Sequence, residues 1–295
     1  MNQKILSILF LLSVAVTACA QQQLYDTLTK PLLISKQFSF TEGPSVDKKG
    51  NVFFTDQPNN KIWEYGVDGK LSIFMDNAGR SNGTYFDNKG NLITCADEHD
   101  QLWSISPNKK IAILVHDLNG HLLNGPNDVW VTPDGDMYIT DPYYQRDYWT
   151  RKKPDLEGQN VYYLAKGGNK LITVVKDMQQ PNGIVGTTDG KYLFIADIKA
   201  NKTYKYTINS DGSLTNKQLF TEQGSDGMTL DSEGNVYLTG NGVTIYNPAG
   251  VKIGHINIDE PWTANLCFGG KNKDDLFITA SKAIYILHMK VRGVE

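Results

Sequence analysis

Five polar side chains recur at a fixed distance before a glycine that opens a strand-like segment. Each carries an oxygen atom and lies eight residues before its glycine: Glu42, Asn82, Asn127, Asn182 and Asp226 precede Gly50, Gly90, Gly135, Gly190 and Gly234. Carboxylate and amide oxygens are the ligands that hard divalent cations prefer in proteins. If the repeat brings these side chains together, the pattern predicts a site for one divalent cation. Ca²⁺ suits it best, and Mg²⁺, Mn²⁺ or Zn²⁺ would be tolerated.

A second interpretation of the repeat is structural. Asn and Asp often form the turns that precede strands, and Asn82 lies in a Ser-Asn-Gly sequence that fits either role. A turn alone would not require the residue type to vary while the offset stays fixed. Two carboxylates, Glu42 and Asp226, are also costly to hold close together unless a cation neutralises them.

The segments after these glycines resemble one another and read as short strands. They cover residues 50–56, 90–97, 135–141, 190–197 and 234–240, with 274–280 as a sixth copy. Successive glycines are about 40 to 55 residues apart, which is the length of one four-stranded propeller blade. The sequence therefore predicts an all-β protein, a six-bladed β-propeller, in which the repeated polar side chains point towards the axis.

The sequence between these strands supplies the rest of each blade. Residues 61–76, 101–117, 160–177, 203–220 and 243–256 show paired runs of alternating polarity, which indicate hairpins. Residues 32–38 are expected to form the outer strand of the last blade, whose inner strands come from 283–291. The third repeat contains an insertion, residues 142–159, rich in Tyr, Trp and Arg. Such an insertion is typical of a lid or a substrate wall, although a disordered surface loop is the alternative.

The first 20 residues have the layout of a secretory signal peptide. Lys4 precedes an apolar run, residues 5–16, that is too short to span a bilayer. Residues 16–19 resemble a lipobox, which makes Cys19 the predicted lipidation site; ordinary cleavage before Gln21 is the alternative. We expect residues 21–34 to form a tether and 35–295 a single catalytic propeller domain. The protein would be exported to the periplasm or cell envelope and reach the membrane only through a lipid on Cys19.

Charge and cysteine content exclude some classes of function. The 29 basic and 32 acidic residues give a net charge of −3, so nothing favours a nucleic acid partner. An exported protein could pair Cys95 with Cys267, but no local motif links the two, and buried free thiols are expected.

Several motifs together resemble one known family. The segments TEGPSVD (41–47), 122–144 with Pro126-Asn127-Asp128, 179–197 with Pro181-Asn182-Gly183, 224–240 with Ser225-Asp226-Gly227-Met228, and 263–280 are similar to the gluconolactonase/regucalcin (SMP-30/gluconolactonase/LRE-like) family. The resemblance covers the chain from about residue 36 to its end. It implies a six-bladed propeller that hydrolyses a small-molecule sugar lactone. It also implies that Glu42, Asn182 and Asp226 hold one metal, with Asn127 as a further ligand or water contact.

The resemblance also suggests roles in the reaction. The cation would polarise the lactone carbonyl, and Asp226 would be the general base that takes a proton from water. Five further roles are inferred from position in the sequence and not from the resemblance. Asn82 and Asn127 would orient substrate hydroxyls, and the pocket would be lined by Tyr143, Tyr144 and Trp262. The sequence departs from the family pattern at Asn265, which is one place out of register, and at residues 120–123, where a basic residue is common.

Three functions remain open at this point. The first is a metal-dependent lactonase. The second is a related esterase or phosphotriesterase, in which the same cation polarises a phosphoryl or ester oxygen. The third is a non-enzymatic binding propeller of the cell envelope, because a propeller fold alone does not fix a function.

Overall fold

The computed structural model describes residues 23–294, which form 24 β-strands and two single-turn 3-10 helices, η1 (Gln57–Asn59) and η2 (Asp97–His99). The predicted signal peptide and the Cys19 lipidation site lie outside these residues. Within residues 23–294, no helix has both the length and the apolar character needed to cross a membrane.

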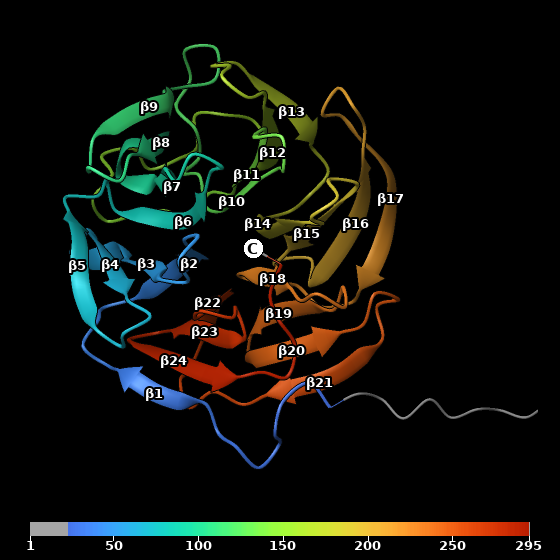
Figure 1. The fold of residues 1–295 in the computed structure, drawn as a ribbon. Helices are drawn as coiled ribbons and strands as arrows, with labels where there is room; N and C mark the ends of the chain where they lie inside the picture. The colour runs from blue at the N-terminus through green and yellow to red at the C-terminus, as the bar shows by residue number, and fades with distance from the viewer. Residues whose placement is uncertain (1–22, 295) are drawn as a thin grey trace, which may run out of the picture.

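The strands form six antiparallel blades around one axis (Figure 1). Each blade runs from its inner to its outer strand. The first three blades are β2 (Thr41–Val46), β3 (Val52–Asp56), β4 (Lys61–Tyr65) and β5 (Leu71–Asp76); β6 (Ser81–Phe86), β7 (Leu92–Ala96), β8 (Gln101–Ile105) and β9 (Ile111–Val115); and β10 (Val129–Val131), β11 (Met137–Asp141), β12 (Asn160–Leu164) and β13 (Leu171–Val175).

The last three blades repeat this order. They are β14 (Pro181–Gly186), β15 (Tyr192–Asp197), β16 (Lys202–Ile208) and β17 (Leu214–Thr221); β18 (Met228–Leu230), β19 (Val236–Gly240), β20 (Gly242–Tyr246) and β21 (Lys252–Ile256); and β22 (Thr263–Gly269), β23 (Asp275–Ala280), β24 (Ala283–His288) and β1 (Leu32–Ser35). The prediction of an all-β, six-bladed propeller is confirmed. The six predicted second strands correspond to β3, β7, β11, β15, β19 and β23.

The N-terminal segment closes the ring. Strand β1 pairs antiparallel with β24, so the outer strand of the sixth blade comes from the start of the chain, as predicted. The predicted tether, residues 21–34, is wrong for its described part. Leu24 is buried among the apolar side chains of the last two blades, and the Tyr25 hydroxyl donates a hydrogen bond to the His255 carbonyl over 2.9 Å. Residues 24–35 are therefore held against the propeller by apolar burial and by the pairing of β1 with β24, and they do not form a tether.

The core lies between neighbouring blades, where the inner strands are buried on both faces. All six residues of β2 and all seven of β22 are buried, as continuous contact between packed sheets requires. Cys95 and Cys267 lie buried in this core and are not joined in a disulfide, as predicted.

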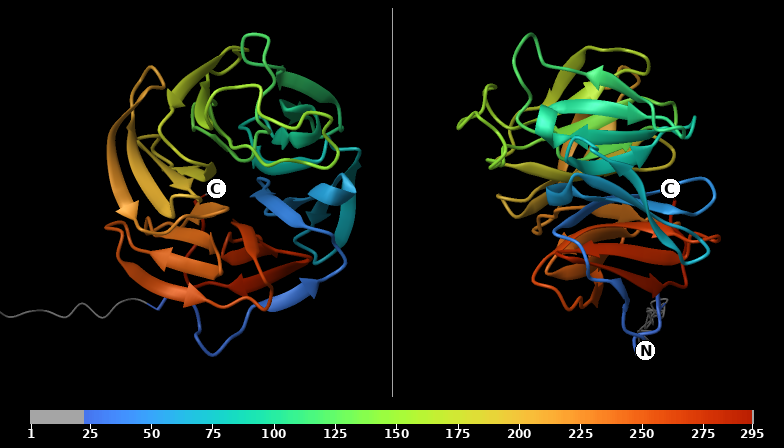
Figure 2. Two further views of the ribbon diagram at one scale, coloured as in Figure 1. Left: turned by 180° about the vertical axis from the view of Figure 1, so that it is seen from behind. Right: turned by 90° about the vertical axis from the view of Figure 1, so that its left-hand side faces the viewer.

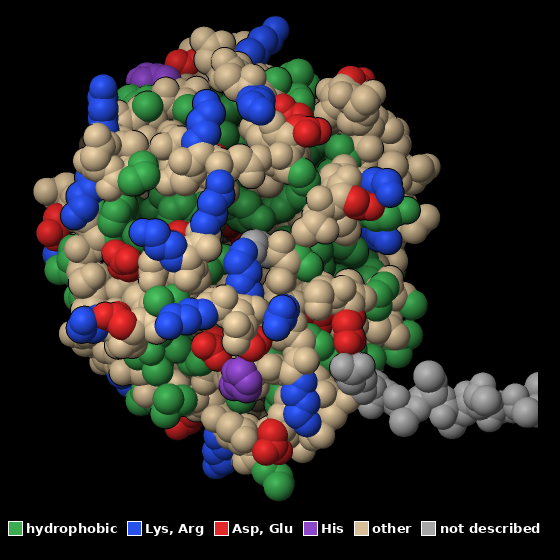
Figure 3. Space-filling view, in the orientation of Figure 1, with side chains coloured by type: hydrophobic (Ala, Val, Ile, Leu, Met, Phe, Trp, Pro, Cys, Tyr) green, Lys and Arg blue, Asp and Glu red, His purple; other side chains and the backbone are tan. Residues whose placement is uncertain are grey.

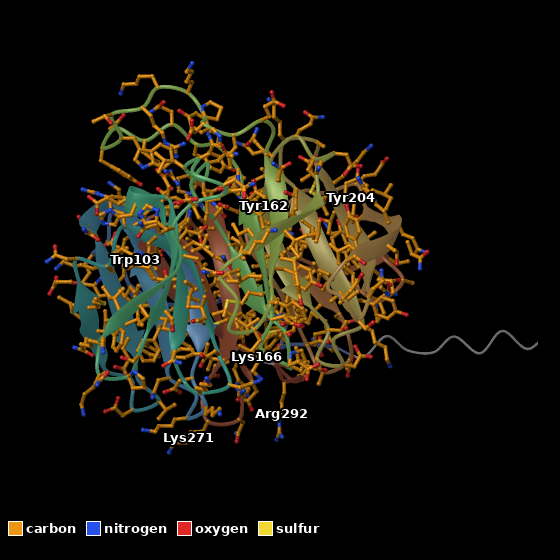
Figure 4. The ribbon with its side chains drawn as sticks, turned by 90° about the horizontal axis from the view of Figure 1, so that it is seen from above. Trp103, Tyr162, Lys166, Tyr204, Lys271 and Arg292 are labelled. Atoms are coloured by element: carbon orange, nitrogen blue, oxygen red, sulfur yellow. The ribbon has the colours of Figure 1, made fainter. Side chains whose placement is uncertain are left out.

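The two faces of the ring differ. The hairpins that leave the inner strands lie on the face towards the viewer in Figure 1, and Figure 4 shows Lys166, Lys271 and Arg292 at that end. The inner strands begin at the opposite face. The insertion between β11 and β12 also lies there, and in the left view of Figure 2 it covers part of the ring. The repeated polar residues and the insertion therefore share one face.

Candidate metal and substrate site

The predicted ligand residues lie at the starts of the inner strands, where the chain forms β-bulges. The pairing of β2 with β3 shifts by one residue between Glu42 and Ser45. The same shift occurs between Ser81 and Thr84 in the second blade and between Pro181 and Ile184 in the fourth. A bulge inserts an unpaired residue and turns its side chain away from the regular alternation. Asn82 is therefore part of β6 and its bulge, and the turn interpretation is wrong for this residue.

Asn182 and Asp226 meet directly at the axis. The Asn182 side-chain nitrogen donates to Asp226 Oδ1 over 2.9 Å and to the Tyr144 hydroxyl over 3.0 Å. Trp262 Nε1 donates to Asp226 Oδ2 over 2.6 Å. Burial raises the pKa of Asp226 to about 6, against the opposing effect of the hydrogen bonds from Trp262 and Asn182. This carboxylate is thus held in place by two donors and remains a usable base near neutral pH.

Glu42 is the second carboxylate of the site. It is buried, and both this burial and the negative charge of Asp226 raise its pKa well above the usual value. Its Oε2 accepts a hydrogen bond from the Asn265 side-chain nitrogen over 3.1 Å. Asn265 therefore contributes to the site, although its offset in the sequence left its role unassigned.

Asn265 occupies the structural position of Asp128 rather than that of Asn127. In both residues the backbone N–H donates to a threonine Oγ1 of the next strand, over 3.1 Å for Asp128 and 3.0 Å for Asn265. In both, the side-chain Oδ1 accepts the following backbone N–H, over 2.9 and 2.8 Å respectively. The sequence does contain a signal for this position. Four blades have glycine directly after the repeated polar residue, whereas the third and sixth blades have Asp128 and Asn265 at the equivalent place.

Those glycines give Asp128 and Asn265 room to extend across the axis. A Cβ atom on Gly83 would lie 2.4 Å from Asp128 Oδ1, and one on Gly227 would lie 2.0 Å from the Asn265 Cγ and Oδ1. Neither distance allows a real Cβ atom. Around the ring, two blades with glycine at this position precede each blade with a side chain, and each side chain lies against the glycine of the blade before it. Asn265 also lowers the pKa of Asp128, against the larger opposing effect of burial, and its side chain donates to Glu42.

Replacing Gly227 with alanine is expected to destabilise the fold by about 1–3 kcal/mol, the usual cost of overpacking. The new methyl group would overlap the Asn265 side chain, whose atoms are the three nearest neighbours of that position. Urea unfolding of Gly227→Ala, Asn265→Ala and the double variant tests this. The double variant should be more stable than the sum of the two single losses predicts; strict additivity would contradict the steric explanation.

The residues present suit a hard cation. Asn82 Oδ1 and Asn182 Oδ1 are buried and accept no hydrogen bond within the described residues. A buried oxygen without a partner is costly, and a cation satisfies it. The two carboxylates Glu42 and Asp226 supply the balancing charge. Asn127 is also buried in this region, where its backbone oxygen accepts from the Gly83 N–H over 2.7 Å.

The aromatic residues predicted to line the pocket divide into two groups. Tyr144 and Trp262 contact the axial residues through Asn182 and Asp226. The Tyr143 hydroxyl instead donates to Gln145 over 2.6 Å, within the insertion itself. Trp262 is 37% exposed, so its ring forms part of the open surface above Asp226.

A separate group of possible ligands lies at the other end of the sixth blade. Among residues 23–294, Asp274, Asp275 and His288 place one ligand atom each within 4.8 Å of the others. His288 Nδ1 lies 3.1 Å from Asp275 Oδ1, so the group is already paired in part. The sequence pattern did not predict this cluster, because Asp274 and Asp275 begin the sixth repeated strand whereas His288 ends the following strand, β24.

The face with the hairpins carries a cavity of about 680 Å³. Phe53, Tyr85, Trp130 and Val185 line its apolar part. Figure 3 shows this face, with hydrophobic side chains at its centre and Lys and Arg side chains around them. None of the predicted site residues lines this cavity, so it is distinct from the axial site.

Fold and site together define a six-bladed propeller with an oxygen-rich cluster at one end of its axis. Residues 40–282 match the SMP-30/gluconolactonase/LRE-like region, and the chain belongs to this family. The resemblance found in the sequence is therefore confirmed.

Relatives and solved structures agree with this assignment. A gluconolactonase of Zymomonas mobilis is 26% identical over 91% of this chain and 83% of its own length. The lactonase drp35 of Staphylococcus haemolyticus is 24% identical over 82% and 77%. An X-ray structure of a protein provisionally assigned as a gluconolactonase is 29% identical, with a TM-score of 0.84 over 92% of this chain and 96% of that one. Regucalcin of Agrobacterium tumefaciens, described as calcium-binding, shares the fold, with a TM-score of 0.74, 19% identity, and coverage of 90% and 95%.

Proposed function

We propose that this protein is a lactonase that opens a sugar lactone with one divalent cation held by Glu42, Asn127, Asn182 and Asp226. The family and its lactone-hydrolysing relatives support a lactone-hydrolysing enzyme. The observation that carries the metal-dependent form is the buried Asn182 Oδ1, which accepts no hydrogen bond within residues 23–294, together with the buried carboxylates of Glu42 and Asp226. Asn82 Oδ1 is buried in the same way and is left for the substrate. The calcium-binding relative of the same fold favours Ca²⁺ among the possible ions.

The cation, when bound, would polarise the lactone carbonyl and stabilise the charge that develops on its oxygen. Asp226 takes the proton of the attacking water on one carboxylate oxygen, since its pKa of about 6 leaves it mostly ionised at neutral pH. Trp262 and Asn182 hold that carboxylate in one orientation through their hydrogen bonds. Asn82 and Asn127 orient the hydroxyl groups of the sugar.

We also propose that the protein is exported and anchored in a membrane through a lipid on Cys19. The support for this is the sequence of residues 1–22. In this arrangement the propeller would meet its lactone in the periplasm or at the cell envelope.

Substrate profiling tests the proposed function. Purified protein supplied with Ca²⁺, Mg²⁺, Mn²⁺ or Zn²⁺ in turn is assayed for proton release from aldonolactones, an aryl ester and a phosphotriester. We expect turnover of at least one aldonolactone that exceeds turnover of both other classes. Activity confined to the ester or the phosphotriester would replace the lactonase with the related hydrolase. Cation binding without turnover of any compound would favour the binding propeller.

A further inference from the structure

An aspartate recurs at the end of the second strand in four blades, and one copy has a different role. Asp56 Oδ1 accepts the backbone N–H groups of Ser39 and Phe40, over 3.1 and 3.2 Å. Asp141 and Asp197 likewise accept two backbone N–H groups each from the segment that leads into the inner strand of the same blade. These three aspartates fasten their own blade.

Asp97, the copy in the second blade, binds the insertion of the third blade instead. Its side chain is 1% exposed, and Oδ2 accepts hydrogen bonds from Arg146 Nε over 2.8 Å and from the Tyr148 hydroxyl. Trp149 Nε1 donates to the Asp97 carbonyl over 3.0 Å. Releasing the insertion would leave the buried Asp97 carboxylate without these partners, which would strongly destabilise the folded protein. These contacts therefore hold the insertion in place.

A second ion pair fixes the far part of the insertion. Arg151 Nη2 donates to Asp100 Oδ1 over 2.6 Å and to the Asn124 carbonyl over 2.7 Å. The Arg151 guanidinium also lies 4.0 Å above the Trp149 ring. The insertion is therefore held at two points, Asp97 at the start of η2 and Asp100 just after its end, and the disordered alternative does not hold. The structure favours the substrate wall.

Tyr144 connects the anchored insertion to the axial site. The Arg146 guanidinium carbon lies 5.5 Å from the centre of the Tyr144 ring, a favourable cation–π distance. The Tyr144 hydroxyl accepts the Asn182 side-chain N–H over 3.0 Å, and Asn182 also contacts Asp226. Because the hydroxyl is the acceptor in this contact, its own hydrogen remains available.

We propose that Tyr144 is a catalytic hydrogen-bond donor to the lactone carbonyl oxygen, and that Asp97 and Arg146 are positioning residues that hold it there. The inference rests on the proposed lactonase function. As water adds to the carbonyl carbon, the C=O π electrons move to the oxygen, and the Tyr144 hydroxyl stabilises that charge without transferring its proton. A donor fixed before the reaction needs no reorganisation as the charge forms.

Tyr144→Phe tests the donor directly, because it removes one oxygen atom and keeps the ring. We expect kcat for the best aldonolactone to fall by about 10²–10³-fold, as when one oxyanion donor is removed, with a smaller change in KM. The melting temperature and the cation affinity measured by calorimetry should remain those of the wild type. Tyr192→Phe, in the fourth blade on an exposed side chain, is the matched control and should not change kcat.

Arg146→Met and Asp97→Asn test the positioning role. Each should lower kcat by about tenfold or more, and Arg146→Met should cause little further loss in the Tyr144→Phe background, since residues that act through one group are not additive. Limited proteolysis should show whether the insertion itself has loosened.

Two results would overturn the inference. One is a Tyr144→Phe variant with kcat within twofold of the wild type. The other is full additivity of Arg146→Met with Tyr144→Phe, which would make Arg146 a purely structural residue. A wild-type protein that turns over no lactone would overturn the proposed function as well, whereas wild-type turnover with an unaffected Tyr144→Phe variant overturns this inference alone.

Discussion

Asp226→Asn is expected to lower kcat for lactone hydrolysis by about 10²–10⁴-fold, the usual contribution of a positioned general base. Asparagine keeps the size of the side chain and can still accept a hydrogen bond from Trp262 or Asn182, but it cannot take a proton from water. It also removes one of the two carboxylates proposed to bind the cation, so cation affinity should fall as well. Steady-state kinetics at saturating Ca²⁺, with calorimetry of Ca²⁺ binding, separate the two effects.

Two comparisons make this result specific. Asp189→Asn changes an exposed aspartate in the turn between β14 and β15, at the opposite end of the blade, and should leave kcat unchanged. Glu42→Gln removes the other axial carboxylate and should mainly reduce cation affinity. If Asp226→Asn retained kcat within tenfold of the wild type once saturated with Ca²⁺, Asp226 would be a ligand and not the base.

Removing the cation with a chelator should abolish activity and make stability depend strongly on pH. Burial raises the pKa of Asp226 to about 6 and that of Asp128 to about 8, and it also raises the pKa of Glu42. Between pH 4 and 8 the folded state therefore binds more protons than the unfolded chain. Because stability falls with rising pH wherever the folded state binds more protons, the metal-free protein should lose stability over this range.

The size of this effect is measurable. A rise from the ordinary value of 3.8 to about 6 for Asp226 alone corresponds to about 3 kcal/mol lost by pH 8. Urea unfolding of chelated protein at pH 5 and pH 8 should show about half of this loss, about 1.4 kcal/mol, because the rest occurs below pH 5. Excess Ca²⁺ should restore stability more at pH 8 than at pH 5. Asp226→Asn should flatten the pH dependence. A metal-free protein that became more stable between pH 5 and 8 would contradict the picture of uncompensated axial carboxylates.

Much of the fold was readable from local pattern. A blade is built from contiguous residues, so its strand alternation and turn glycines appear in order along the chain. The same holds for ring closure by residues 32–38, because the sixth blade otherwise lacked an outer strand. The described part of the tether was misjudged because Leu24 and Tyr25 are held by contacts with the last two blades, which the local sequence does not reveal.

The candidate site was predictable only in part. Glu42, Asn127, Asn182 and Asp226 were found because they share one offset. The role of Asn265 was left unassigned because this residue occupies the position of Asp128, one residue after that of the repeated polar side chains. The partner of Asn265, Glu42, is 223 residues away in the chain. The contact of Trp262 with Asp226 is also between blades, and no spacing within a repeat could reveal it.

The sequence by itself determined the propeller, the family and the oxygen ligands that recur once per blade, because these follow from periodicity and residue type. Only the tertiary structure decided which side chains meet at the axis, and that Asp97 holds the insertion of a different blade. The physical reason is that each blade satisfies its own backbone locally, whereas burial of charge at the axis depends on side chains from several blades. The hydrogen-bond partners of each axial carboxylate come from other blades, so they are in place only in the closed ring.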